Sequence, residues 1–396
     1  MSDLGFRAFD ADHHYYEHED AFIRHIDPKL KRRCMQWAEI NGRKRLLVGG
    51  KLNSFIPNPT FDPVAKPGIL DAFFRGKNPE GKSMIALFGE LDPINPAYRD
   101  RDARVSLVKS QGLDGAFMFP TLAVGMEVAL SHDPEAACAA FRAFNRWLVE
   151  DWGFSYQDTL FAAPYIPLMD PAWAVEELEW ALAQGAKMIC MTPGPVVAGA
   201  VTRSPGDPIY DPFWARLGEA GITLSIHAGD AGYNRFADEW GVGGDFRAFD
   251  YDSLRACLSP APAADTLAAM VCHGLFTRHP NVRVATIECG SQWVGPLLAR
   301  LKKAYGQMPF AFEHDPVEQF RRNIWVAPYY EDDLEGLKAA ITAEHVLFGS
   351  DYPHAEGLAV PTDFIHDCKG YDQDEIRLVM RENAMGLIVP RPASAA

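Results

Sequence analysis

Carboxylate and imidazole side chains alternate near the start of the chain in a pattern that suits metal coordination. Asp10, Asp12 and His14, in the sequence FDADHH, are spaced by two residues. Residues at this spacing point to the same side of an extended strand. Because a carboxylate and an imidazole that project side by side can bind one ion, Asp12 and His14 are predicted metal ligands.

Two other apolar runs end in residues of the same kind. The run LSIH ends at His227, where Ala228 and Gly229 leave space for a ligand, and FGSD ends at Asp351. Together with Asp12 and His14, these residues form a set that suits one divalent ion, either Zn²⁺ or Mn²⁺. We therefore predict a metal centre, with Asp351 also taking part in catalysis.

These residues need a scaffold that brings strand ends together. Short apolar runs alternate with segments of helical periodicity, for which helices are predicted at 133–150, 171–184 and 264–277. Strands are predicted at 6–12, 115–120, 160–166, 187–192, 222–227, 282–288, 323–327 and 345–350. About eight parallel strands with intervening helices indicate an α/β fold, the (β/α)8 TIM barrel, in which catalytic groups lie at the C-terminal strand ends.

The chain is predicted to form a single domain over residues 1–396 with two long insertions. They follow the first and fifth strands, at about 15–95 and about 228–263, and exceed the few residues usual in such loops. We interpret both as lids over the catalytic face. Residues 43–56 are predicted to form a hairpin inside the first insertion, because Gly49 and Gly50 separate two apolar stretches.

Composition excludes several classes of partner and compartment. The formal net charge is -15, and no long Lys/Arg run offsets it, so we expect no nucleic acid or membrane partner. The seven cysteines contain no C-x-x-C pair and are expected to be reduced thiols. The chain has neither a signal-peptide pattern nor about 18 consecutive apolar residues, which predicts a soluble, cytoplasmic protein.

Four motifs carry a resemblance that spans nearly the whole chain: FDADHHYYE, LSIHAGD, HGLFTRHPNVRVATIECG and FGSDYPHAEG. They resemble the amidohydrolase-related branch of the amidohydrolase superfamily that includes aminocarboxymuconate semialdehyde decarboxylase and γ-resorcylate decarboxylase. The branch's first-strand H-x-H or E-x-H pair maps to Asp12 and His14, and its later histidine and aspartate map to His227 and Asp351. The resemblance implies a metal-dependent TIM barrel that cleaves a C–C bond in an aromatic or unsaturated carboxylic acid, and a homodimer or homotetramer.

One position departs from the branch. Many of its decarboxylases have a histidine at the end of the sixth strand, whereas this chain has Glu288 in the sequence IECG. A carboxylic acid whose pKa is raised by an apolar site can donate a proton as an imidazolium would, so Glu288 is a candidate catalytic acid or base.

Further residues are candidates for contact with the substrate or support of the ligands. Glu17 could orient an imidazole, Arg203 could bind a carboxylate, and Trp293 could form the wall of an aromatic pocket. Each also has an ordinary explanation as a solvated loop, surface or core residue. The full set is Glu17, Arg203, His273, Trp293, His354 and Glu356.

Three functions are compatible with these patterns. The first is non-oxidative decarboxylation of a carboxylic acid, in which Glu288 or Asp351 protonates the carbon that loses CO₂. The second is metal-dependent hydrolysis of a ring-cleavage product, ester, lactone or amide, with Asp351 accepting the proton of the attacking water. The third is a non-catalytic barrel that binds a small acid, for which an incomplete set of ligands is expected.

Overall fold

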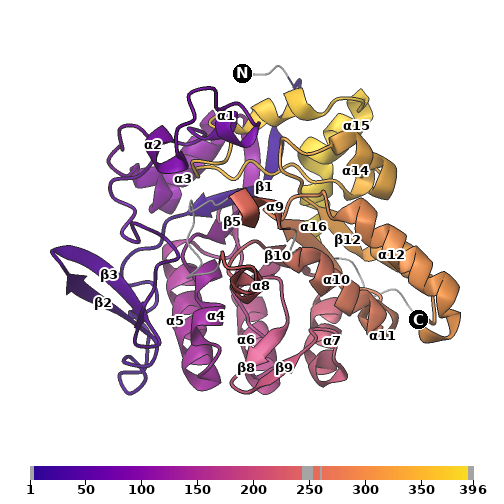
Figure 1. Ribbon diagram of the computed structural model, residues 1–396, viewed down its shortest axis with the longest axis horizontal. Coiled ribbons are helices and arrows are strands. Elements are labelled where there is room, and N and C mark those ends of the chain that lie inside the picture. The colour runs from indigo at the N-terminus through magenta and orange to yellow at the C-terminus, as the bar shows by residue number, and fades with distance from the viewer. Residues whose placement is uncertain (1–3, 243–252, 259–260, 391–396) are drawn as a thin grey trace.

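The computed structural model describes residues 4–242, 253–258 and 261–390 of the chain. Parallel strands at its centre form two sheets, each with helices packed around it (Figure 1). The first sheet has the order β1-β5-β6, with β1 (Ala8–Tyr15), β5 (Leu113–Pro120) and β6 (Leu160–Ala162). The second has the order β12-β11-β10-β7, with β7 (Met188–Met191), β10 (Thr223–His227), β11 (Arg283–Ile287) and β12 (Ile324–Val326).

Backbone contacts join the two sheets between β6 and β7. Tyr165, which follows β6, forms an isolated parallel bridge with Cys190 of β7. The amide of Ile166 donates to the carbonyl of Cys190 at 3.1 Å. The strand predicted at 160–166 is therefore extended over most of its length, although only Leu160–Ala162 form the regular strand β6.

The predicted eighth strand at 345–350 is extended but is not a regular strand. The amide of Leu347 donates to β12 at 2.8 Å, and the carbonyl of Phe348 accepts from β1 at 2.8 Å. This segment consequently lies between β12 and β1 and bonds to both. Directly after it, Asp351 adopts a left-handed backbone conformation with φ 58°.

The long helices pack around the strands, and several begin at an aspartate that caps the first turn. They are α3 (Arg101–Ser110), α5 (Pro134–Asp151), α6 (Pro171–Ala183), α7 (Asp211–Ala220), α10 (Pro262–Cys272), α12 (Val294–Gln307), α13 (Pro316–Asn323) and α14 (Leu334–Ile341). Asp133 and Asp170 accept hydrogen bonds from first-turn amides of α5 and α6, which lie where helices are predicted. The helix predicted at 264–277 ends early, because Gly274 at φ 70° separates α10 from α11 (Leu275–Arg278).

Short elements fill the connections. The insertion after β1 contains an antiparallel sheet of β2 (Met35–Ile40), β3 (Arg43–Val48) and β4 (Lys51–Leu52), followed by α1 (Asp71–Phe74) and α2 (Met84–Leu87). Its β2–β3 hairpin projects away from the strands (Figure 1). The remaining short elements are α4 (Glu127–Leu130), β8 (Val196–Ala198), β9 (Val201–Arg203), α8 (Asn234–Glu239), α9 (Ser253–Cys257), α15 (Gln373–Arg377) and α16 (Asn383–Ile388).

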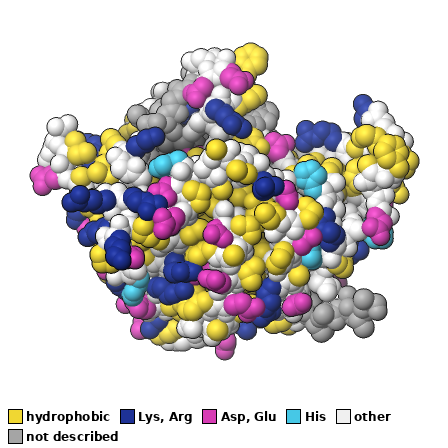
Figure 2. Space-filling model, turned by 90° about the horizontal axis from the view of Figure 1, so that it is seen from below, with side chains coloured by type: hydrophobic (Ala, Val, Ile, Leu, Met, Phe, Trp, Pro, Cys, Tyr) yellow, Lys and Arg dark blue, Asp and Glu magenta, His cyan; other side chains and the backbone are white. Residues whose placement is uncertain are grey.

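The hairpin predicted at 43–56 corresponds to β3 and β4, with Gly49 and Gly50 both at positive φ in the turn. Of the second predicted insertion at 228–263, residues 243–252 and 259–260 lie outside the described part of the chain. On the face drawn in Figure 2, acidic and basic side chains are interspersed among hydrophobic ones, and neither charge forms a continuous patch among the residues described there. Within the described ranges, no helix has both the length and the apolarity needed to cross a lipid bilayer.

Candidate metal centre

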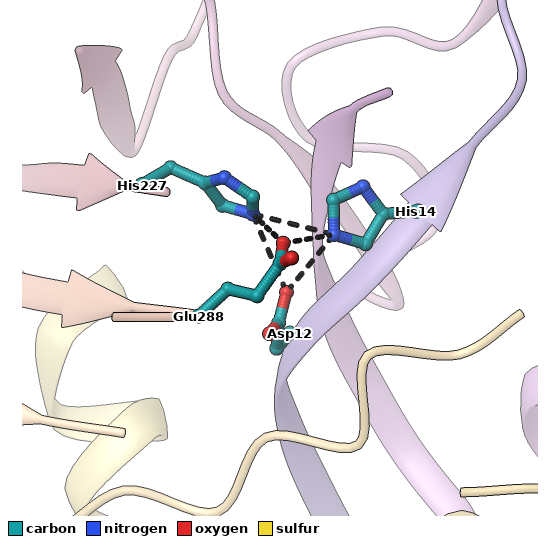
Figure 3. A group of neighbouring side chains, drawn as sticks. All are labelled: Asp12, His14, His227 and Glu288. Carbon is teal, nitrogen blue, oxygen red and sulfur yellow. Dashed lines mark hydrogen bonds and ion pairs between the residues drawn. The ribbon is translucent and has the colours of Figure 1, made fainter. Parts of the chain in front are cut away.

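Four side chains carried by β1, β10 and the turn after β11 point toward one another (Figure 3). Asp12 and His14 come from β1, His227 is the last residue of β10, and Glu288 directly follows β11. Asp12, His14 and His227 are buried, whereas Glu288 retains some exposure. Asp12 and His14 both reach the cluster, although β1 has one extra residue relative to β5 between Asp10 and His13.

The separations within this cluster fit the edges of a metal shell. His14 Nε2 lies 3.3 Å from Asp12 Oδ1, 3.4 Å from Glu288 Oε2 and 3.3 Å from His227 Nε2. His227 Nε2 lies 3.6 Å from Asp12 Oδ1 and 3.4 Å from Glu288 Oε2. A tetrahedral shell with ligand distances of about 2.0–2.2 Å has edges of about 3.3–3.6 Å. The four residues thus have the chemistry and the spacing for one divalent ion.

Buried atoms without hydrogen bonds support the same interpretation. Asp12 Oδ1 and Asp351 Oδ1 are buried and make no hydrogen bond, although both lie within ion-pair distance of His14 Nε2. The Nδ1 atom of His227 lies 2.8 Å from the carbonyl of Ala228. If Nδ1 donates its proton to this carbonyl, the lone pair of Nε2 is free to bind a cation. Metal-bound histidines usually make a hydrogen bond of this kind through their other ring nitrogen.

The charges of the cluster perturb its protonation. Burial alone would raise the pKa of Asp12, but the contacts with His14 and His227 lower it below its ordinary value. Burial alone would lower the pKa of His14, and the contacts with Asp12 and Glu288 raise it to about 9. The negative carboxylates therefore favour the protonated imidazole, and the imidazoles favour the ionised carboxylate.

A second group of carboxylates lies beside the cluster. The pKa of Asp351 is raised well above its ordinary value by burial and by the nearby charges of Glu288 and Glu356. Burial and the charge of Glu288 raise the pKa of Glu356 to about 8. Several carboxyl groups thus share a buried site, and the negative charge of each one disfavours ionisation of the others. A bound cation would reduce this repulsion.

Asp351 and Glu288 both have left-handed backbone conformations, with φ 58° and φ 53°. Such values are uncommon for residues other than glycine and concentrate at functional sites. Asp351 Oδ1 lies 3.3 Å from His14 Nε2 and 2.6 Å from His354 Nδ1. The predicted ligand Asp351 and the predicted site residue His354 therefore both border the cluster.

Asp10 of β1 and Arg104 of α3 support the proposed ligands without joining them. Asp10 Oδ1 accepts hydrogen bonds from the amides of Asp12 and Ser350, both at 3.0 Å, and its Oδ2 lies 3.0 Å from His13 Nε2. Arg104 of α3 is fully buried and donates to the carbonyl of His14. These contacts fix the backbone that carries Asp12 and His14.

Glu17 is buried, and its carboxylate bonds to backbone amides and belongs to neither group of possible metal ligands among the described residues. It accepts hydrogen bonds from the amides of Thr121 at 3.3 Å, Leu122 at 2.8 Å and Ala123 at 3.0 Å. Burial raises the pKa of Glu17 to about 7, against the opposing effect of these backbone bonds. Glu17 therefore anchors the turn that follows β5.

The other predicted site residues lie in different surroundings. Arg203 is exposed on β9 and pairs with Asp207 at 3.2 Å, and His273 Nδ1 lies 2.7 Å from Ser204 Oγ at the end of α10. Among the described residues, neither contacts the cluster. Trp293 is mostly buried, and its indole N–H lies 3.1 Å from the carbonyl of Cys289, so it holds the turn after Glu288.

Arg104 and Thr121 were not among the residues predicted from the sequence. Thr121 Oγ1 lies 3.0 Å from His354 Nε2 and also donates to the carbonyl of Tyr15 at 3.0 Å. Both residues are distant in the sequence from the groups they contact. No local pattern in the sequence indicates either contact.

Comparison with known proteins adds a family and close structural relatives. Residues 94–387 match the amidohydrolase family, a range that includes His227, Glu288 and Asp351 and begins after β1. The crystal structure of an amidohydrolase from Mycobacterium avium subsp. paratuberculosis is 46% identical, with a TM-score of 0.92 over 97% of this chain and 99% of that chain. None of the curated proteins compared with this chain matches it.

More distant solved structures share the fold. A dihydroxybenzoic acid decarboxylase from Polaromonas sp. JS666, with bound manganese and 2-nitroresorcinol, is 18% identical, with a TM-score of 0.57 over 85% of this chain and 95% of that chain. A 5-carboxyvanillate decarboxylase from Sphingomonas paucimobilis is 16% identical, with a TM-score of 0.60 over 97% of this chain and 99% of that chain. Together with the parallel strands described above, these likenesses indicate the TIM-barrel type of α/β fold.

Proposed function

Because the chain belongs to the amidohydrolase family and is an enzyme of that superfamily, we propose that it is a metal-dependent decarboxylase of an aromatic or unsaturated carboxylic acid. The observation that carries the proposal is the buried cluster of Asp12, His14, His227 and Glu288, whose separations fit a divalent ion. The decarboxylases named above support the choice of reaction, since they share the fold.

In this proposal, Asp12, His14, His227 and Glu288 hold one Zn²⁺ or Mn²⁺ ion. An ion held there would supply positive charge to attract an anionic substrate and to offset negative charge that develops on it. Glu288 takes the position at which many decarboxylases of the branch have histidine, and its contacts with both imidazoles support a role as ligand. Asp351, expected from the sequence as a ligand, lies beside this set.

Asp351 is the proposed proton donor. Its Oδ1 atom is buried, makes no hydrogen bond and lies 3.3 Å from His14 Nε2, so it borders the space next to the ligands. In decarboxylation, Asp351 Oδ1 delivers a proton to the carbon that carries the carboxylate, the C–C bond breaks, and CO₂ leaves. His354 contacts Asp351 Oδ1 and fixes its position.

We also propose that residues 1–396 form one catalytic domain whose insertion after β1 covers the site as a lid. Backbone bonds support this role, since Gly68 donates to the carbonyl of His354 at 3.1 Å and Leu70 donates to the carbonyl of Ala355 at 2.8 Å. Tyr16 and Phe61 stack with their ring centroids 4.5 Å apart, which ties the insertion to the end of β1.

A test compares dihydroxybenzoates that carry a hydroxyl group next to the carboxylate with 3-hydroxybenzoate, which lacks one. The full-length, Mn²⁺-loaded protein is expected to release CO₂ from the first group only, as measured by gas analysis and product chromatography. Asp351→Asn serves as the matched control and is expected to retain the ion but lose the reaction. Absence of CO₂ release from any such acid, with metal bound, would contradict the proposal.

Hydrolysis is the second candidate, favoured by one observation. Glu288 provides a carboxylate where many decarboxylases of the branch have histidine. In hydrolysis, Asp351 Oδ1 would accept the proton of the attacking water and pass it to the leaving group. Turnover of esters or lactones by the same preparation, without CO₂ release from the acids, would select this candidate.

A further inference from the structure

A cavity of about 240 Å³ lies beside β7 and β10. Its wall includes Met191 of β7 and both Leu224 and Ile226 of β10. Because β10 pairs with β7 and β11 in unbroken register, Ile226 and His227 point to opposite faces of the sheet. Of the described residues that line the cavity, none is a proposed metal ligand, Asp351 or His354. The cavity is therefore separate from the metal centre.

Apolar side chains make up most of the wall. In addition to the strand residues, they come from the segment before α6, from β8 and from α10, and they include Leu168, Met169, Val196, Val197 and Met270. An engineered apolar cavity of roughly 150 Å³ binds benzene. This cavity consequently has room for a compact molecule with one ring and a short polar substituent.

Glu127 of α4 contributes a carboxylate to this apolar wall. The hydroxyl of Tyr165 donates to Glu127 Oε2 at 2.5 Å, and Thr192 Oγ1 lies 3.2 Å from the same oxygen. The other oxygen, Oε1, makes no hydrogen bond with any residue in the described part of the chain. A group of this kind is costly to bury, and Oε1 can accept hydrogen bonds from a molecule in the cavity.

The charges around the cavity favour a cation. Burial raises the pKa of Glu127, against the opposing effect of the Tyr165 and Thr192 hydroxyls, so neighbouring groups do not fully compensate its charge. Arg235 of α8 is the one basic side chain among the described residues of the wall, and it is exposed to water. The formal net charge of -15 also favours approach of cations over anions.

We propose that this cavity binds a compact organic cation, a primary ammonium group on an apolar ring or chain. The ammonium group donates to Glu127 Oε1, and the apolar part contacts the wall formed by β7, β8, β10 and α10. A charge-assisted hydrogen bond combined with apolar contacts is the usual basis of affinity in such a pocket. The inference concerns a site apart from the reaction and does not rest on the proposed function.

Isothermal titration calorimetry of the full-length, Mn²⁺-loaded protein tests the proposal. Cyclohexylmethylamine is the probe, and cyclohexylmethanol has the same shape without the charge. The wild type is expected to bind the amine at least tenfold more tightly than the alcohol. Glu127→Gln, which keeps an acceptor for Tyr165, is expected to weaken amine binding at least tenfold and to change alcohol binding little. Val197→Trp, which fills the cavity, is expected to lose both ligands.

The outcomes also separate this site from the metal centre. Equal amine affinity in metal-free and Mn²⁺-loaded wild type is expected, and binding that requires Mn²⁺ would overturn the inference. No saturable binding of the amine, or an unchanged amine affinity in folded Glu127→Gln, would also overturn it. If Glu127→Gln does not fold, unchanged amine binding by Val197→Trp would contradict the inference. Failure of CO₂ release would overturn the proposed function alone.

Discussion

The site has two halves that differ in backbone geometry. Asp12, His14 and His227 belong to parallel strands and are buried, whereas Glu288 and Asp351 have left-handed backbone conformations and are more exposed. The strand half obtains its geometry from the sheet without left-handed residues, although the β1–β5 register shifts between Asp10 and His13. The turn half has strained backbone, a feature that persists where the surrounding structure enforces it. The difference in backbone geometry matches the proposed division of roles, in which the strand half binds the ion and Asp351 of the turn half reacts with the substrate.

Removal of an imidazole from the strand half is expected to have the largest effect. His227→Phe should weaken Mn²⁺ binding by more than roughly 100-fold, which is the upper range for loss of a group that merely orients a ligand. CO₂ release should fall with it. Titration of the metal-free protein with Mn²⁺ measures the change, and His366→Phe, at an exposed position, serves as control. An unchanged Mn²⁺ affinity in folded His227→Phe would show that the strand half does not bind the ion.

A change in the turn half is expected to separate chemistry from ion binding. Asp351→Asn should lower kcat by roughly 10²–10⁴-fold, the usual range for loss of a general acid. The affinity for the ion should change much less than in His227→Phe. Steady-state kinetics on the metal-loaded protein give kcat, and dialysis gives the affinity. If both quantities fell together, Asp351 would belong with the strand-half ligands.

Glu17 supports the turn half through the residues after β5, which include Thr121. Its pKa is raised from the ordinary value of 4.5 to about 7, mainly by burial. Because the folded protein holds the Glu17 proton more tightly than the unfolded chain, protonation adds to the free energy of unfolding. This contribution is complete below pH 4.5 and is lost as the pH rises through about 7, a loss on the order of 3 kcal/mol. The difference in unfolding free energy between wild type and Glu17→Gln should decrease over this window. Urea denaturation of metal-free protein measures it, and a constant difference would contradict the assignment.

Glycine and alanine substitutions are expected to have opposite relative effects in the two halves. At Glu288, with φ 53°, Gly should be more stable than Ala by about 1 kcal/mol, because Ala retains the left-handed strain. At Asp12, inside β1, Gly should be less stable than Ala by about 0.5–1 kcal/mol. Urea denaturation of the four metal-free variants gives both differences. The same order at both positions would show that the halves do not differ in backbone strain.

Most of the strand half could be predicted from the sequence, and the turn half only in part. Period-two spacing places Asp12 and His14 on one side of a strand, and the apolar run before His227 indicates a strand end. The conformations of Glu288 and Asp351 depend on tertiary contacts that no local pattern shows. The segment before Asp351 has a strand-like composition but bends instead of completing a regular ladder.

The contacts that support the site residues were the hardest to predict from the sequence. Arg104 reaches the carbonyl of His14 across 90 residues, and Thr121 reaches His354 across 233 residues. Charge and possible carboxylate binding suggested Arg203 as a site residue, but the exposed β9 hairpin places it in a pair with Asp207. Residue type indicates what a side chain can do, and only the packed fold determines which groups it meets.

Metal content is the most direct test of the account. Wild type, His227→Phe and Asp351→Asn should be purified without added chelator or metal and analysed by plasma mass spectrometry. The account predicts about one Zn²⁺ or Mn²⁺ per chain in the wild type, near-complete loss in His227→Phe, and retention of the ion in Asp351→Asn. A wild type without metal, even after reconstitution with Zn²⁺ and Mn²⁺, would contradict it.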